Sequence, residues 1–208
     1  MITVYHLTSS RSERIVWLLE ELGIDYQLER FRREETGAAP ESMKRIHPLG
    51  RAPVIRDGDM VLAESNAIVE YIIQRHGGGR LAVASSGATY ARYLYWLHFA
   101  EGSLMPLLQI ALALSRLPDA NATPLGTRVQ ARMQLMLRFV DAELEHVPYF
   151  AGADFTAADV TMTFPFTTMR RFLDYDVEPY SHIAAYVKRI EARPAYQKAM
   201  ALAGPDAK

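Results

Sequence analysis

The chain has 208 residues, with 23 lysines and arginines against 24 aspartates and glutamates, which gives a net charge of −1 at pH 7. A surface without excess positive charge lacks the electrostatic footprint of a protein that binds nucleic acid or an anionic membrane. Half of the residues are apolar, as is typical of a globular protein, and cysteine is absent. The composition therefore excludes disulfides, thiolate metal sites and a cysteine nucleophile, so any thiol that reacts here has to arrive with a ligand.

Neither of the two apolar stretches that could target the chain to a membrane has the features of such a segment. The N-terminal stretch has no basic residue before it and no cleavage-like site after it. The internal stretch, residues 104–114, is interrupted by Pro106 and Gln109 and is shorter than the roughly 18 residues that span a bilayer. We therefore expect a cytoplasmic protein without membrane association.

The first part of the chain alternates β-rich runs with amphipathic helices. Residues 2–6 and 26–30 are predicted strands, and apolar side chains at i, i+3, i+4 and i+7 predict a helix over residues 11–22 between them. Two further apolar runs flank Asp57-Gly58, which is a strong hairpin signal. Another helix is predicted over residues 65–76. This order indicates a thioredoxin-like α/β layout, because a β-α-β unit implies a parallel strand pair with a crossover helix.

The rest of the chain is predicted to be helical. Three consecutive glycines at 77–79 and a run of small residues predict a linker. The long helical segment 90–117 should be kinked or broken by Pro106. Thr156-x-x-Asp159 has the pattern of a capping box at the start of a buried helix. We predict an α/β domain over residues 1–79, a linker over residues 80–88 and an all-α domain over residues 89–208.

Three segments resemble those of one protein family. They are YHLTSSRSER at residues 5–14 with the helix that follows, HPLGRAPV at residues 47–54 with LAESNAI at residues 62–68, and FTAAD at residues 155–159. In this order, and with a helical second half, they resemble the glutathione transferases, most closely the serine-type bacterial and fungal enzymes. The resemblance implies a thioredoxin-like domain followed by an all-α domain, glutathione as co-substrate and a homodimer.

Ser10 is the first candidate for catalysis. Ser10-x-x-Glu13 is also a capping box, so a helix N-cap explains this serine without chemistry. The resemblance implies that a serine at this place donates a hydrogen bond to the sulfur of glutathione. A helix N-terminus favours an anion by roughly 0.3–1 kcal/mol, and a hydrogen bond to a charged acceptor adds about 1.5–3 kcal/mol. Together they could lower the thiol pKa by roughly one to three units. Ser9 is the alternative donor, whereas Tyr5 is expected to belong to the strand.

The resemblance also implies the residues that bind glutathione: Arg51, Ala52, Pro53, Val54, Glu64 and Ser65. Ser65 and Glu64 would hold the γ-glutamyl end, although Ser65 can also be read as a helix N-cap. Pro53 would follow a cis peptide bond, so that the backbone of Val54 pairs with the cysteinyl backbone of glutathione, as in strand addition. Arg51 would reach the glycine carboxylate or be a solvated loop charge.

In the helical half, the resemblance implies an acceptor pocket for a small hydrophobic electrophile. Its candidate residues are Tyr93, Trp96, Phe99, Met105, Met162 and Phe166. An aromatic stripe at helical spacing is more often core than pocket, so both interpretations stay open. Asp159 is assigned to folding rather than catalysis, at about 1 kcal/mol of stability.

The histidines have no metal-ligand spacing, and the phosphate-binding pattern GxxxxGK[ST] is absent, so we expect neither metal nor ATP. The main hypothesis is a glutathione transferase whose thiolate attacks a small apolar electrophile. A glutathione-dependent peroxidase, disulfide reductase or isomerase would use the same site. A non-catalytic binding module with this fold is the third possibility.

Overall fold

The computed structural model describes residues 1–207, which form two compact units. Residues 1–82 together with residues 191–207 make up one unit, here called the α/β unit, and residues 83–190 make up the other, called the helical unit. The fold is that of a thioredoxin-like α/β part and an all-helical part, as expected.

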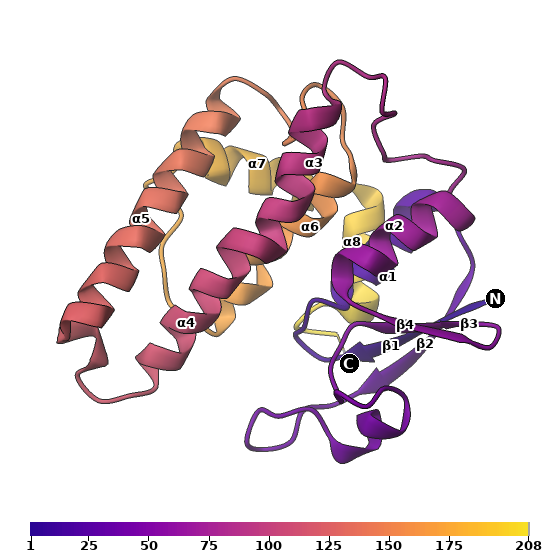
Figure 1. Cartoon of the computed structure of the whole chain (residues 1–208), viewed down its shortest axis with the longest axis horizontal. Helices are drawn as coiled ribbons and strands as arrows, with labels where there is room; N and C mark the ends of the chain where they lie inside the picture. The colour runs from indigo at the N-terminus through magenta and orange to yellow at the C-terminus, as the bar shows by residue number, and fades with distance from the viewer. Residues whose placement is uncertain (208) are drawn as a thin grey trace. The chain divides into compact units, whose positions relative to one another are not determined.

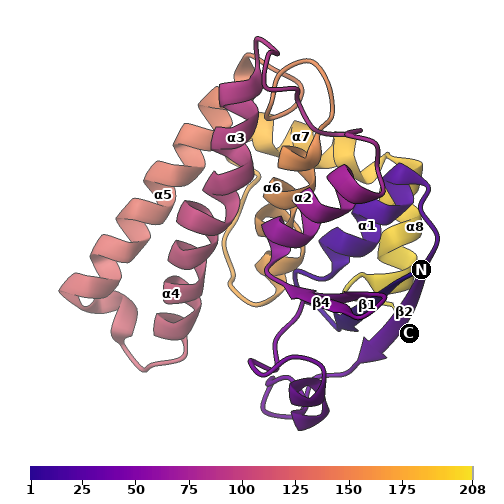
Figure 2. The same ribbon diagram turned by 45° about the vertical axis from the view of Figure 1, so that its right-hand side comes forward.

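The α/β unit is built on a four-stranded sheet with the strand order β2-β1-β3-β4. Strand β1 is parallel to β2 and antiparallel to β3, and β3 and β4 form the predicted hairpin. The helices α1, α2 and α8 lie on one face of the sheet, and the segment that carries the short helix η1 lies on the other side (Figures 1 and 2). The elements are β1 (Ile2–Leu7), α1 (Glu13–Leu22), β2 (Tyr26–Phe31), η1 (Glu41–Arg45), β3 (Val54–Asp57), β4 (Met60–Ala63), α2 (Ser65–Arg75) and α8 (Pro194–Ala203).

The predicted helix before Gly23 forms because its apolar residues share one face, which packs into the core of the α/β unit. Ile15, Leu18 and Leu19 have no exposed surface. Gly23 ends α1 in the left-handed conformation, with φ of 62°, which glycine adopts at little cost. The helix begins at Glu13, two residues later than predicted.

The structure differs from the expected domain division at its C-terminal end, because α8 packs with the α/β unit. Tyr196 meets the indole of Trp17 edge to face at 4.9 Å. Arg193 donates two hydrogen bonds of 2.7 Å to the carboxylate of Glu21, and Lys198 pairs with Glu20 at 2.7 Å. These contacts join residues more than 170 positions apart, so no local pattern in the sequence predicts them.

The helical unit contains a long helical run with a π-helical turn inside it, and a central buried helix. Its elements are α3 (Tyr90–Phe99), η2 (Ala100–Leu104), α4 (Met105–Ser115), η3 (Ala120–Ala122), α5 (Pro124–Glu145), α6 (Ala157–Phe166), η4 (Thr168–Arg171) and α7 (Ser181–Glu191). All ten residues of α6 are buried. The predicted break at Pro106 takes the form of one π-helical turn, η2, directly before α4. Such a local change of helix type accommodates the proline, which has no backbone N–H to donate within the helix.

The continuous helical run Tyr90–Ser115 has 26 residues and is long and apolar enough to cross a membrane by length and composition alone. Its inward face is occupied, since Trp96, Leu104 and Leu108 are at most 1% exposed. Such a buried face is what a core helix of a helical unit requires.

Candidate functional site

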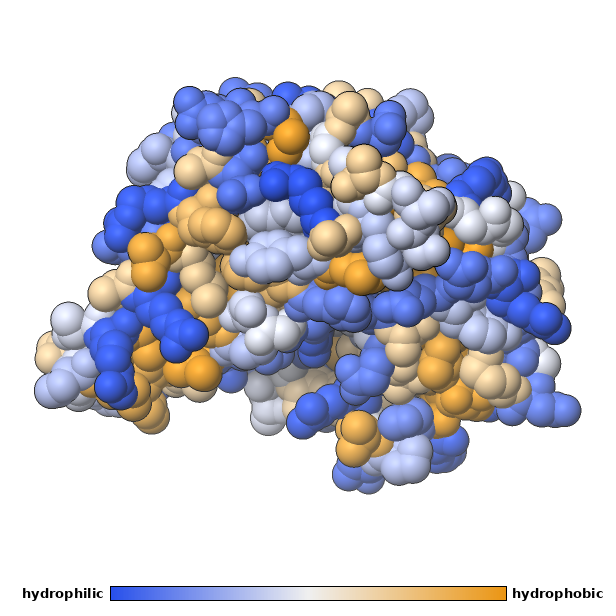
Figure 3. Space-filling view, turned by 45° about the horizontal axis from the view of Figure 1, so that its top comes forward, coloured by the Kyte–Doolittle hydropathy of each residue, from blue (hydrophilic) through white to orange (hydrophobic). Residues whose placement is uncertain are grey.

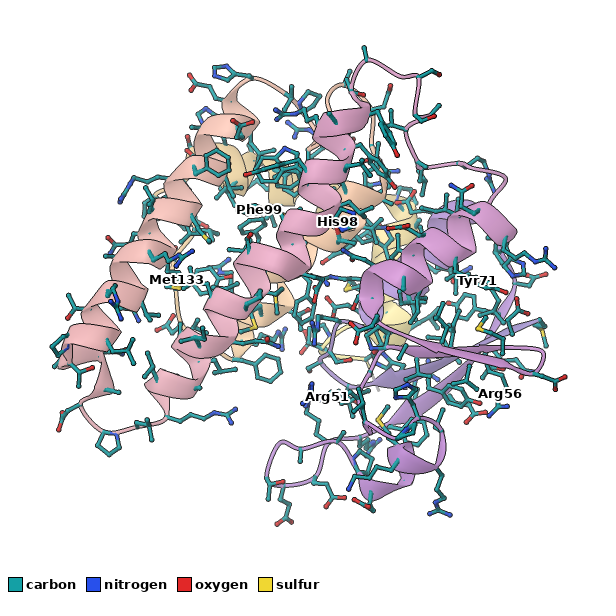
Figure 4. All side chains as sticks on the ribbon, in the orientation of Figure 1. Arg51, Arg56, Tyr71, His98, Phe99 and Met133 are labelled. Carbon is teal, nitrogen blue, oxygen red and sulfur yellow. The ribbon has the colours of Figure 1, made fainter. Side chains whose placement is uncertain are left out.

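The sheet register brings three loops of the α/β unit to the same end of the sheet. Val54, the first residue of β3, pairs with Tyr5 on one side and with Ala63, the last residue of β4, on the other. The loop after β1, the segment before β3 and the start of α2 therefore meet at this end. Figure 4 shows Arg51 there, while Arg56 lies towards the hairpin turn at the opposite end.

The peptide bond between Ala52 and Pro53 is cis, as predicted. Pro53 and Val54 are buried at the start of β3. Because Val54 has a strand on each side, no free sheet edge lies beside it for a ligand backbone. Ala52 is half-buried and lies outside the strands. The geometry thus favours Ala52 over Val54 as the residue whose backbone is available for strand addition.

The first turn of α2 lies beside this segment. Ser65 is the first residue of the helix and Glu64 occupies the N-cap position, so the predicted N-cap is wrong by one residue. Glu64 is exposed and has a φ of 75°, a value that non-glycine residues rarely adopt. Strained backbone of this kind concentrates at binding sites, and the N–H groups of the first turn have no acceptor within the helix. This arrangement can bind a carboxylate.

The loop between β1 and α1 is held by an arginine from the segment after β2. Arg33 donates from Nε to the carbonyl of Thr8 at 3.0 Å and from Nη2 to the carbonyl of Ser9 at 3.1 Å. Ser9 is half-exposed and has a φ of 52°. These contacts fix the backbone on which both candidate serines stand.

Ser10 does not form the capping box that its spacing to Glu13 predicts. Its hydroxyl accepts a hydrogen bond from the backbone N–H of Ser12 at 3.3 Å and lies 2.7 Å from the Ser12 hydroxyl. Ser12 takes the N-cap position of α1, and the N–H of Glu13 donates to the carbonyl of Ser10 instead. Ser10 nevertheless stands just before the helix N-terminus, where an anion is favoured.

A histidine that sequence reasoning left without a role lies behind the serines. The Nδ1 atom of His6 is 2.8 Å from the Ser12 hydroxyl, and the ring is 2% exposed. Burial, together with the positive charge of Arg30, lowers the pKa of His6 to about 4. The ring is therefore neutral at pH 7. No spacing rule marks this pair, because the contact depends on how β1 and α1 pack.

Two further residues lie where the sequence predicted. Tyr5 belongs to β1, and its hydroxyl accepts a hydrogen bond from Nε of Arg56 at 3.0 Å. His47 is part of a turn, since its Nδ1 accepts from the N–H of Leu49 at 3.4 Å. Arg51 is exposed. Within residues 1–207, no three His, Asp or Glu side chains converge as metal ligands.

Most of the predicted acceptor-pocket residues are buried in the helical unit. Tyr93, Trp96, Met105, Met162 and Phe166 are at most 4% exposed. Trp96 stacks on Phe139 with ring centres 5.6 Å apart and lies 4.8 Å from the ring of Phe150. This burial favours a core role for these five side chains, and their part in a pocket stays a prediction.

Phe99 is the exception among the predicted pocket residues. It is half-buried and lines an open hollow of about 520 Å³ on the helical unit. Figure 4 places Phe99 and His98 on α3. Aromatic and aliphatic side chains dominate the lining, with one imidazole and the hydroxyls of a tyrosine and a serine, as in sites that take small apolar molecules. The lining residues are Leu94, Tyr95, His98, Phe99, Gly102 and Ser103.

Both halves of the chain match known family models. Residues 1–74 match the glutathione S-transferase N-terminal domain, and residues 104–194 match the glutathione S-transferase C-terminal domain. The chain is 34% identical to glutathione S-transferase 3 of Schizosaccharomyces pombe, over 94% of this chain and 85% of the relative. It is 27% identical to glutathione S-transferase 1 of Saccharomyces cerevisiae, over 97% of both chains.

Solved structures show the same fold over almost the whole chain. A glutathione S-transferase from Actinobacillus pleuropneumoniae is 37% identical with a TM-score of 0.88, covering 99% of this chain and 95% of that one. A glutathione transferase homologue from Lodderomyces elongisporus, with two GSH per subunit, is 20% identical with a TM-score of 0.80, covering 97% and 98%.

Proposed function

Because this chain belongs to the glutathione S-transferase family and is an enzyme of that family, we propose that Ser10 activates the bound glutathione thiol for attack on a small apolar electrophile. The observation that supports this best is the meeting of the serine loop, the cis-Pro53 segment and the N-terminus of α2 at one end of the sheet. We propose that one tripeptide contacts all three.

We propose that glutathione lies across this end of the sheet with its γ-glutamyl group at α2. The α-carboxylate would accept hydrogen bonds from the first turn of the helix and from Ser65, and the Glu64 carboxylate would pair with the ammonium group. The cysteinyl backbone would bind beside Ala52, Pro53 and Val54. Arg51 would pair with the glycine carboxylate.

In this arrangement the sulfur lies near the Ser10 hydroxyl. A donated hydrogen bond stabilises the thiolate more than the thiol, so the thiol loses its proton to solvent at a lower pH. The thiolate then attacks the electrophilic carbon: a carbon–sulfur bond forms, and a leaving group such as halide departs with the electron pair. Phe99 and its neighbours in the hollow of the helical unit are the candidates for acceptor binding.

The experiment is a comparison of glutathione-dependent reactions on the purified chain. We expect saturable binding of glutathione, an ultraviolet thiolate band at neutral pH, and turnover of a generic aryl halide. A peroxide or mixed-disulfide rate far above the aryl halide rate would replace the electrophile with an oxidant, while leaving the thiolate site intact. Failure to bind glutathione at millimolar concentration would contradict the proposal and leave a non-catalytic module.

We also propose that the chain forms a homodimer. Several large apolar side chains are exposed on α4, on α5 and in the connection between them, and Figure 3 shows apolar surface at the end of the helical unit where these helices meet. Large apolar patches on soluble proteins mark interaction surfaces. The residues are Ile110 on α4, Leu125, Leu135 and Phe139 on α5, and Leu117 in the connection between the two helices. Sedimentation should give twice the chain mass at micromolar concentration, whereas a monomer there would contradict this.

A further inference from the structure

Three buried side chains link the candidate catalytic hydroxyl to the interior of the α/β unit. Ser10 Oγ lies 2.7 Å from Ser12 Oγ, which lies 2.8 Å from His6 Nδ1. Ser10 is 7% exposed, Ser12 is fully buried and His6 is 2% exposed. Both separations are those of strong hydrogen bonds. We call this row of atoms the serine–histidine relay.

The number of hydrogens in the relay limits the ways in which its hydrogen bonds can be arranged. The Ser12 hydroxyl has one hydrogen and two lone pairs, and the N–H of Leu7 donates into one of them at 3.2 Å. The Ser12 hydrogen can go to Ser10, to His6 or to the carbonyl of Leu7, which lies 3.4 Å away. In the first arrangement His6 donates to Ser12 and Ser12 to Ser10, and in the second Ser10 donates to Ser12 and Ser12 to His6. In the third, which uses the longest of these contacts, His6 and Ser10 both donate to Ser12 and Ser12 donates to Leu7.

These arrangements have different consequences at Ser10. If Ser10 donates into the relay, its only hydrogen is used and it has none for a thiolate. If it accepts from the Ser12 hydroxyl, it accepts a second bond from the Ser12 N–H at 3.3 Å. Both lone pairs are then occupied, and the Ser10 hydrogen can only point out of the relay. A thiolate stabilised by Ser10 therefore requires the direction in which His6 donates to Ser12 and Ser12 donates to Ser10.

We propose that His6 and Ser12 are positioning residues for the thiolate: His6 donates from Nδ1 to Ser12, Ser12 donates to Ser10, and the Ser10 hydrogen is thereby directed to the glutathione sulfur. The proposal rests on the proposed function of Ser10 and extends it to two residues that do not touch the substrate. It assigns the Nδ1–H tautomer to His6 in the glutathione complex.

The remaining surroundings of His6 are consistent with a fixed, neutral donor. Burial lowers the pKa of the ring well below 7, so it carries a single hydrogen. The imidazole sits on β1 opposite Arg30 of β2, and that positive charge opposes a second proton. Hydrogen bonds in such a chain polarise one another, so donation by His6 should strengthen the bond from Ser10 to the sulfur.

The test is the pKa of the bound glutathione thiol, measured from the thiolate ultraviolet band against pH. His6→Leu and Ser12→Ala each remove one donor from the relay. We expect each to raise the thiol pKa by about half a unit to one unit. At pH values below the thiol pKa, the fraction of bound glutathione that is thiolate then falls about three- to tenfold. Below the thiol pKa, where bound glutathione keeps its proton in every variant, the dissociation constant should change less than about twofold, because the main contacts of glutathione are elsewhere.

His6→Asn is the conservative rescue, because its amide can donate to Ser12 from near the position of Nδ1. It should return the thiol pKa to within about 0.2 units of wild type. Thr8→Val is the matched control: it removes a hydroxyl of the same loop that donates to the carbonyl of Phe31 and is outside the relay. Its thiol pKa should equal that of wild type.

Two outcomes distinguish a wrong relay proposal from a wrong assignment of Ser10 as the thiolate donor. If Ser10→Ala raises the thiol pKa while folded His6→Leu and Ser12→Ala keep the wild-type value, the relay is overturned and Ser10 stands. If Ser10→Ala has no effect, the proposed function of Ser10 fails first. The tautomer of His6 can also be measured without any variant, by side-chain nitrogen NMR of the wild-type glutathione complex. Nδ1–H on His6 supports the proposal, and Nε2–H overturns it.

Discussion

Replacing Ser10 by alanine is expected to raise the pKa of the bound glutathione thiol by about one to two units and to lower kcat/KM at neutral pH by about 10- to 100-fold. A hydrogen bond to a charged acceptor contributes about 1.5–3 kcal/mol, and each pKa unit corresponds to 1.36 kcal/mol. The affinity for glutathione measured below the thiol pKa should change little, because the γ-glutamyl and glycine ends bind elsewhere. The measurement is the thiolate band against pH, with steady-state kinetics on an aryl halide.

Ser9→Ala is the companion variant, and Thr8→Val is its control on the same loop. Ser9 is more exposed than Ser10 and stands in a left-handed conformation held by Arg33. If Ser9→Ala produces the shift and Ser10→Ala does not, Ser9 is the donor. If neither shifts the thiol pKa, activation comes from backbone N–H groups at the start of α1 rather than from a serine.

The parts of the fold that the sequence predicts are those specified by local signals. The strand and helix periods gave β1, α1 and β2, and Asp57-Gly58 marked the β3–β4 hairpin. Thr156-x-x-Asp159 forms the predicted capping box. Each of these signals acts within about ten residues, so neighbouring side chains and backbone are sufficient to specify the structure.

The features that sequence reasoning missed depend on how the elements pack against one another. The capping-box pattern at Ser10 does not form, since Ser12 takes the N-cap position of α1 and its hydroxyl contacts Ser10 and His6 of β1. The packing of α8 on α1 rests on Trp17 with Tyr196 and on the Glu21–Arg193 ion pair. Burial of Met162 and Phe166 follows from the central place of α6, which an apolar run alone does not distinguish from a pocket wall.

Asp159→Ala is expected to lower the free energy of unfolding by about 3 kcal/mol, and the melting temperature by about 6–12 °C. This is more than a surface cap contributes, because the carboxylate is fully buried and accepts three hydrogen bonds. The donors are the N–H groups of Phe150 and Thr156, at 2.9 and 2.8 Å, and the Thr156 hydroxyl. Alanine leaves two buried backbone donors without an acceptor. Denaturant and thermal unfolding measure the loss.

The acidity of Asp159 gives this prediction a pH dependence. Burial raises its pKa to about 6, against the hydrogen bonds from Phe150 and Thr156, which favour the ionised form. Because the folded pKa lies above the unfolded value, ionisation opposes folding as pH rises from about 4 to 6. The stability advantage of wild type over Asp159→Ala should therefore decrease through that window and stay constant above it.

The control for this variant is Asp154→Ala, which removes an exposed carboxylate five residues earlier and should cost less than about 0.5 kcal/mol. Turnover per folded molecule should stay within about twofold of wild type for both variants, because Asp159 acts on the start of α6 and not on the glutathione site. A stable Asp159→Ala enzyme with lost turnover would place Asp159 in catalysis instead. An advantage over Asp159→Ala that grows as pH rises from 4 to 6 would mean that the three hydrogen bonds outweigh burial and hold the carboxylate ionised.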